Sequence, residues 1–166
     1  DYKNQEKKSD MPIAMHPKKL NLGPATAFEV NVDGTLALFG RNTQATRPWR
    51  KYGGGASGDV WIAKKSCPNP QGKDGKTYTD FKRVDALDDF FTSVSQPKWL
   101  DNSAMVFLAE SKQGERGLWS FSVADNAQNE LSRQPTLLVK DASIQSYSIE
   151  PSGKCTYASR CGQLYT

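Results

Sequence analysis

The sequence has few of the residues that most enzymes and metal sites need. Its three cysteines (Cys67, Cys155 and Cys161) form no CxxC pair, which argues against a zinc site and a disulfide scaffold. The only histidine, His16, lies in a polar N-terminal stretch, and no Gly-x-Ser-x-Gly motif is present. We therefore expect no catalytic residue, no metal and no cofactor in this chain.

Long apolar runs and a strong charge imbalance are missing too. The longest runs resemble "SAMVFLA", far below the roughly 20 residues of a membrane-spanning helix. The net charge of +4 comes from 22 basic and 18 acidic residues that are interspersed, whereas nucleic-acid binders concentrate basic residues on one face. We expect neither a membrane span nor a nucleic-acid partner. The polar start does not distinguish a periplasmic or secreted protein from a cytoplasmic one.

Turn residues between short apolar runs are abundant, and they predict three β-hairpins. Asp-Gly or Pro-x-Gly between two such runs favours a tight turn, because glycine accepts positive φ and proline presets φ for the first turn position. The predicted hairpins are "FEVNVDGTLALFGR" (28–41), "QPKWLDNSAMVFLAES" (96–111) and "YSIEPSGKCTYASR" (147–160), with turns at Asp33–Gly34, Asp101–Asn102 and Pro151–Gly153.

Further strands follow each hairpin. Third strands are predicted at 59–65, 117–125 and 162–166, and fourth strands at 81–87 and 135–141. Residues 83–94 are interpreted as strand plus loop with one helical turn at 87–91. Three tryptophans on these strands are expected in the core between repeats: Trp61, Trp99 and Trp119.

A four-stranded unit that recurs along a chain is typical of a β-propeller. The predicted fold is therefore all-β: a portion of a β-propeller with four-stranded antiparallel blades, about two and a half of them. Residues 1–22 form a polar segment that could end a preceding blade. The blades are expected at 23–90, 91–142 and 143–166, the last incomplete, so the chain is expected to be a fragment, or else to close a ring as a homo-oligomer.

The stretch "WRKYGGGASGDVWIAKK" (49–65) raises the question of a phosphate-binding loop. A P-loop needs Gly-Lys-[Ser/Thr] opening a helix, and a dinucleotide fingerprint also needs a following helix; here a strand follows. We interpret the glycines as an approach to the strand where the backbone packs too closely for side chains.

Beside these glycines lies the one cluster kept as a functional candidate. Guanidinium and aromatic groups on an exposed loop can bind a peptide carboxylate. The alternative is that the aromatic residues pack between blades while the basic groups lie in solvent. The peptide-binding candidates are Arg47, Arg50, Lys51 and Tyr52.

An acidic group at Asp85, Asp88 and Asp89 invites a second hypothesis, a cation site. The group lacks the Asp-x-Asp-x-Asp-Gly loop and terminal Glu of a calcium site. We interpret it as part of a solvated connecting loop.

Several segments together resemble the N-terminal six-bladed propeller of the tricorn protease family. They are "RPWRKYGGGASGDVWIAKK", "FKRVDALDDFFTSVSQPKWL" and "SAMVFLAESKQGERGLWSFSVAD", and the resemblance runs from Gly23 to the end. The blade units alone are also similar to those of TolB-like and WD-like propellers. The chain departs from the family in its turns, in an extra "QGKDGK" at 71–76, and in ending before any peptidase domain.

The resemblance implies a non-catalytic propeller that guides or filters peptide substrates toward a serine peptidase domain of the same parent chain. Because that domain is absent here, no catalytic residue can be carried over. Two other hypotheses stay open: a TolB-like protein-interaction propeller without peptidase activity, and a self-standing enzyme, for which no nucleophile–base pair is visible.

Overall fold

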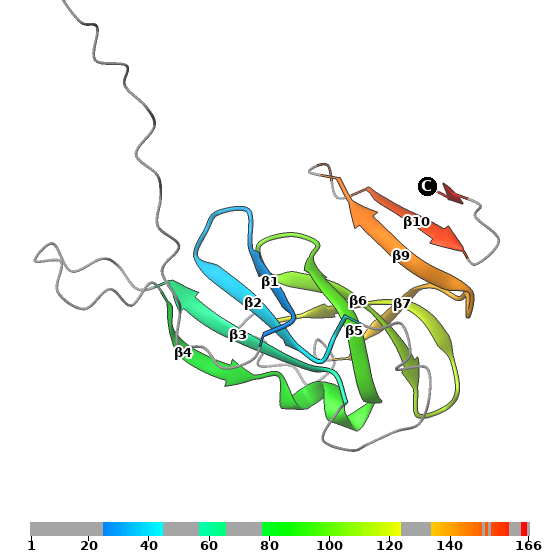
Figure 1. The fold of residues 1–166 in the computed structure, drawn as a ribbon, viewed down its shortest axis with the longest axis horizontal. Coiled ribbons are helices and arrows are strands. Elements are labelled where there is room, and N and C mark those ends of the chain that lie inside the picture. The colour runs from blue at the N-terminus through cyan, green and yellow to red at the C-terminus, as the bar shows by residue number, and fades with distance from the viewer. Residues whose placement is uncertain are drawn as a thin grey trace, which may run out of the picture.

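The computed structural model of this protein describes residues 25–44, 57–65, 78–123, 134–150, 152, 154–159 and 164–165. Within these ranges the chain is all-β apart from one 3-10 helix, Asp85–Asp89. Its antiparallel strands form three open sheets, none closed on itself (Figure 1). Sheet 1 contains β1 (Ala27–Val30), β2 (Leu36–Arg41), β3 (Asp59–Lys65) and β4 (Tyr78–Arg83); sheet 2 contains β5 (Phe91–Trp99), β6 (Ala104–Ser111), β7 (Arg116–Ser122) and β8 (Thr136–Val139); sheet 3 contains β9 (Ile144–Ile149), β10 (Cys155–Ser159) and β11 (Leu164–Tyr165).

In every sheet the strands lie next to one another in the order of the chain. All three predicted hairpins are confirmed, as β1–β2, β5–β6 and β9–β10. The first turn is wider than a two-residue Asp-Gly turn: the Gly34 N–H donates to the Asn31 carbonyl at 2.9 Å, and Gly34 has a φ of 73°. The glycine thus supplies the left-handed position that follows the turn.

The prediction of a strand over 81–87 is wrong at its end. Strand β4 stops at Arg83, and the 3-10 helix Asp85–Asp89 follows, two residues earlier than the expected helical turn. Leu87 explains the change, because the helix turns this side chain into the core, where it is 4% exposed. Strand β5 then begins at Phe91, five residues before the predicted hairpin segment.

The three sheets pack face to face in chain order. One core lies between sheets 1 and 2, and a second lies between sheets 2 and 3. The first contains Leu38 and Val60 of sheet 1 with Phe107 and Trp119 of sheet 2. The second contains five buried residues: Val106, Leu108, Leu118, Ile144 and Tyr147. Sheet 2 is therefore covered on both faces.

The expected burial of the three tryptophans between repeats is confirmed for two of them. Trp119 on β7 and Trp99 at the end of β5 are buried in the core between sheets 1 and 2. Trp61 occupies the equivalent third strand of sheet 1, but it packs with Phe39 on the opposite face. Trp61 and Trp119 thus occupy corresponding third strands but lie in different surroundings. The expected burial between sheets is confirmed for Trp99 and Trp119.

A bulge in β4 sets which side chains face outward on sheet 1. The pairing of β3 with β4 shifts between Ile62 and Lys64, and Asp80 has a φ of 54°. An extra residue in one strand reverses the alternation of side chains beyond it. Tyr78 and Phe81, three positions apart, therefore both contact Phe39 on the outer face.

Candidate functional site

The glycine-rich approach to β3 is described only at its end, Gly58. A Cβ added there would lie 1.9 Å from the Val94 carbonyl oxygen of β5, so no other residue fits without movement. The Gly58 N–H donates to Ser93 Oγ at 2.7 Å, and the Val94 N–H donates to the Gly58 carbonyl at 3.2 Å. Close backbone packing is confirmed at Gly58. Its N–H serves the contact between sheets, which leaves it no role in holding a phosphate.

The four peptide-binding candidates, Arg47, Arg50, Lys51 and Tyr52, lie outside the described residues, as do Gly53–Gly55 and His16. Both flanks of their segment are held by strand β5. The Gln96 N–H donates to the Thr43 carbonyl at 2.8 Å, and Thr43 is fully buried. On the other flank lies the Gly58 contact already described. Both sides of segment 45–56 are thus fixed against sheet 2.

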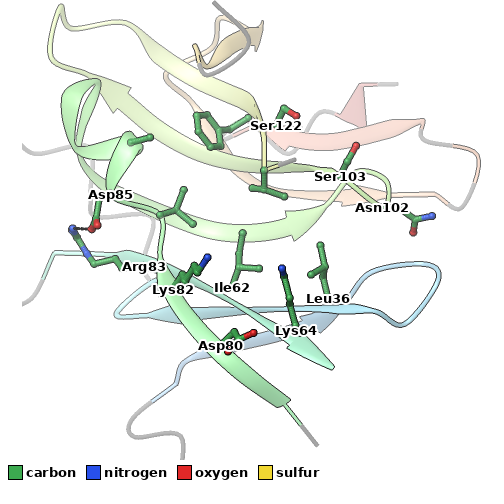
Figure 2. Close-up of a pocket in the computed structure, with 14 residues that line it drawn as sticks. Leu36, Ile62, Lys64, Asp80, Lys82, Arg83, Asp85, Asn102, Ser103 and Ser122 are labelled. Carbon is green, nitrogen blue, oxygen red and sulfur yellow. Dashed lines mark hydrogen bonds and ion pairs between the residues drawn. The ribbon is translucent and has the colours of Figure 1, made fainter. Parts of the chain in front are cut away.

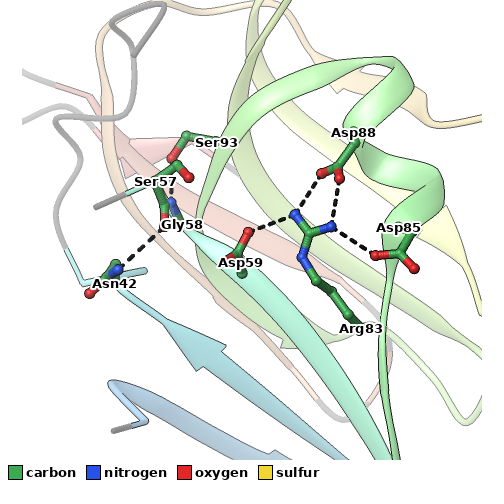
Figure 3. A network of polar contacts seen from close by, with 8 residues as sticks. All are labelled: Asn42, Ser57, Gly58, Asp59, Arg83, Asp85, Asp88 and Ser93. Carbon is green, nitrogen blue, oxygen red and sulfur yellow. Dashed lines mark hydrogen bonds and ion pairs between the residues drawn. The ribbon is translucent and has the colours of Figure 1, made fainter. Parts of the chain in front are cut away.

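An arginine with three carboxylates lies next to the second flank (Figure 3). The Arg83 guanidinium contacts Asp88 at 2.6 Å, Asp59 at 2.9 Å and Asp85 at 2.7 Å. Hydrogen bonds to Asp88 and then Asp59 raise the pKa of Arg83 above its ordinary value. Asp85 and Asp88 therefore form ion pairs with Arg83, which the sequence interpretation did not predict.

A cleft of about 410 Å³ opens between sheets 1 and 2 on the side of β4 (Figure 2). Its size falls in the range of small-ligand sites. The apolar floor is the margin of the core between the sheets: Leu36, Ile62, Val84, Ala86, Phe121 and Val123. The polar rim is contributed by both sheets: Lys64, Asp80, Lys82, Arg83 and Asp85 on one side, and Asn102, Ser103 and Ser122 on the other.

The two ammonium groups on the rim come from neighbouring strands. Figure 2 shows Lys64 and Lys82 pointing up from sheet 1 beside Ile62, with Ser103 and Ser122 on the facing wall. Lys82 pairs with Ile62 in the β3–β4 register, beyond the bulge at Asp80, which turns it toward the cleft. The rim thus places these two cations, with the carboxylates of Asp80 and Asp85, beside an apolar floor.

The facing wall is held in place by contacts between two hairpin turns. The Asp33 N–H donates to Asn102 Oδ1 at 3.0 Å, and Asn31 Nδ2 donates to the Asn102 carbonyl at 3.2 Å. Asp101 Oδ1 accepts from the Ser103 N–H at 2.6 Å. Burial raises the pKa of Asp101, but backbone N–H groups of Ser103 and then Ala104 outweigh it and lower that pKa below 3.8.

The titratable side chains that line the cleft are carboxylates, amines and one guanidinium. Among the described residues that line it there is no histidine or cysteine. Ser103 Oγ donates to Asp101 Oδ1 at 3.1 Å, as in a turn. In the described ranges no three His, Cys, Asp or Glu side chains come together as a metal site.

Sequence reasoning did not find this cleft. Its rim residues lie on strands and turns that are distant in the sequence. The bulge at Asp80 also reverses the in–out alternation of side chains from which the facing of Lys82 would be predicted. No helix in the described part of the chain is long and apolar enough to cross a membrane. In the comparisons with known proteins, no family model, no curated protein and no solved structure matches the chain.

Proposed function

We propose that the three sheets are consecutive blades of a β-propeller. We further propose that this propeller is the non-catalytic part of a tricorn-like serine peptidase, guiding peptide substrates toward a peptidase domain of the same parent chain. One observation carries the fold proposal: each sheet has its strands in chain order, and the sheets pack face to face in that same order. The sequence resemblance carries the link to a peptidase.

The cleft between sheets 1 and 2 supports a peptide as the ligand. Its floor of Leu36, Ile62 and Phe121 offers contacts for one or two aliphatic side chains. Its rim carries three cations, Lys64, Lys82 and Arg83, and two carboxylates, Asp80 and Asp85, so the net positive charge favours an acidic side chain nearby. A short extended segment with leucine beside glutamate combines these two chemistries.

Fluorescence anisotropy with a labelled octapeptide tests the binding. We expect a peptide with a central Leu-Glu pair to bind with a Kd on the order of 10–100 μM, and a Leu-Lys version to bind several-fold more weakly. Lys82→Glu is expected to weaken binding of the Leu-Glu peptide several-fold. Lys154→Glu, at an exposed lysine in the turn between β9 and β10, is the matched control and is expected to leave binding unchanged. If the Lys82→Glu and Lys154→Glu proteins bound the Leu-Glu peptide equally well, the cleft would not be its binding site.

The peptidase part has its own test, a search of the reading frame of the parent gene. A serine peptidase domain downstream of Thr166 supports the proposal, and a frame without one contradicts it. The chain alone is expected to leave the labelled octapeptide uncut, as seen by mass spectrometry after overnight incubation.

A TolB-like interaction propeller is the second candidate. The observation that favours it is the outer face of sheet 1, where Phe28 and Phe81 are exposed at 52% and 40%. A surface of that kind suits a folded protein better than a short peptide. This candidate predicts no octapeptide binding and no peptidase domain in the parent frame.

A further inference from the structure

Arg83 lines two separate hollows of the structure. It lines the cleft between sheets 1 and 2 together with Asp85, and the two side chains form their ion pair at its rim (Figure 2). It also lines a smaller hollow together with Asp59 and Asp88 (Figure 3). Of the three carboxylates that contact this guanidinium, Asp85 is thus the one that lies on the cleft.

Asp85 is also the carboxylate with the weakest hold on Arg83. Asp88 accepts from both terminal nitrogens of the guanidinium, at 2.6 Å and 2.9 Å, whereas Asp85 accepts from one, at 2.7 Å. The side chain of Asp85 is 76% exposed, compared with 56% for Asp88 and 26% for Asp59. An ion pair as exposed as this adds little to stability, because water screens it. Asp85 can therefore leave Arg83 while the other two carboxylates keep the guanidinium in place.

The position of Asp85 has a consequence for any acidic ligand of the cleft. A carboxylate that reaches this part of the rim needs an N–H donor, and Asp85 already accepts from the Arg83 nitrogen there. The rim has a second carboxylate, Asp80, but it is not among the ion-pair partners of Arg83. The two rim aspartates thus carry the same charge but differ in their contact with the arginine.

We propose that Asp85 is an internal competitor for the carboxylate-binding position of the cleft, and that an acidic side chain of a bound peptide displaces it from Arg83. This inference rests on the proposed function, peptide binding in the cleft, and adds the residue that sets its selectivity. The exchange replaces one carboxylate on the guanidinium by another, so the charge-assisted hydrogen bond is kept.

The apolar floor decides which ligands can make this exchange. A peptide whose leucine lies on Leu36 and Ile62 holds its own carboxylate near Arg83 at a high effective concentration, and so competes with Asp85. A small free carboxylate such as acetate has no such anchor. Asp85 therefore selects peptides that combine an aliphatic and an acidic side chain.

The test compares two variants that remove one negative charge each from the same rim, Asp85→Asn and Asp80→Asn. Asparagine accepts the left-handed φ of 54° at position 80, which makes Asp80→Asn a matched control. The anisotropy assay is run with the Leu-Glu octapeptide and with a Leu-Gln octapeptide that lacks the carboxylate. Urea unfolding of both variants is expected to stay close to that of the wild type, since both positions are on the rim.

We expect Asp85→Asn to tighten binding of the Leu-Glu peptide about fivefold and to leave binding of the Leu-Gln peptide unchanged. Asp80→Asn should tighten Leu-Glu binding about twofold, through charge alone. Equal tightening by the two variants overturns the proposal, as does an Asp85→Asn gain that is the same for both peptides.

The outcomes also separate this proposal from the proposed function. Binding by the wild type that Asp85→Asn does not improve overturns the competitor role and leaves peptide binding in place. Binding of the Leu-Glu peptide by Asp85→Asn alone supports the competitor role and contradicts peptide binding by the natural chain. If the wild type and both variants fail to bind either peptide, both proposals are wrong.

Discussion

Sheets 1 and 2 carry the same aromatic pair in different surroundings. Phe107 and Trp119 lie between two sheets, and Phe107 is completely buried. Phe39 and Trp61 lie on the outer face of sheet 1. On that face Phe28, which packs against Phe39, is half exposed. The local sequence design is thus independent of whether a covering sheet is present. We expect the covered face of sheet 2 to contribute more to the free energy of unfolding, because sheet 1 removes it from water.

The largest contrast is expected between Phe107→Ala and Phe28→Ala. Removal of a buried phenylalanine leaves a cavity and costs about 3–5 kcal/mol of unfolding free energy. Phe28 is already 52% exposed, so its removal should cost about 1 kcal/mol or less. Urea unfolding followed by tryptophan fluorescence measures both. Equal losses would mean that the two faces do not differ as described.

A second contrast concerns two glycines. Gly58→Ala places a methyl group against the Val94 carbonyl, and we expect a loss of about 1–3 kcal/mol as sheets 1 and 2 are pushed apart. Gly114→Ala has open space but a φ of 91°, which should cost about 1 kcal/mol. The same urea experiment compares them. If Gly58→Ala proved the milder change, the close contact between the sheets would be refuted.

A smaller loss of stability is expected when the ion pairs that link strands β3 and β4 to the 3-10 helix are removed. Arg83→Met leaves Asp59, Asp85 and Asp88 close together, and we expect a loss of about 1 kcal/mol that shrinks in 1 M salt. The control is Arg116→Met in sheet 2, where one carboxylate, Glu110, is contacted at 2.8 Å; the expected loss is about 0.5 kcal/mol. A salt-independent loss at Arg83 would contradict the electrostatic explanation.

The smallest effects should come from the aspartates of the two hairpin turns. The Thr35 hydroxyl, and then the Thr35 N–H, lower the pKa of Asp33, and N–H groups lower that of Asp101. Both carboxylates are more acidic when folded. Their stabilising effect is therefore present above pH 3.8 and is lost as the pH falls through the lowered values.

Acid titration of unfolding free energy checks this dependence. Asp101→Asn is expected to flatten the decline below about pH 4, and Asp33→Asn to flatten it less because Asp33 is fully exposed to solvent. Curves parallel to that of the wild type would show that these turns do not contribute to the acid sensitivity.

The sequence predicted the all-β class and the three hairpins because turn chemistry is local. Gly34 and Asp101 act within a few residues of where they stand. It could not predict the bulge at Asp80 or the early start of β5, since strand register and the packing of Leu87 depend on distant residues. The cleft was missed for the same reason. Arg47, Arg50, Lys51 and Tyr52 remain a prediction.

The measurement that tests the stacked arrangement most directly is hydroxyl-radical footprinting of the intact chain, read residue by residue with mass spectrometry. The account predicts that Phe28 and Phe81 are oxidised about ten times faster than Phe91 and Phe107, in line with their exposure. Oxidation of Phe107 as fast as that of Phe28 would show that sheet 1 does not cover sheet 2, and the ordered stack would be wrong.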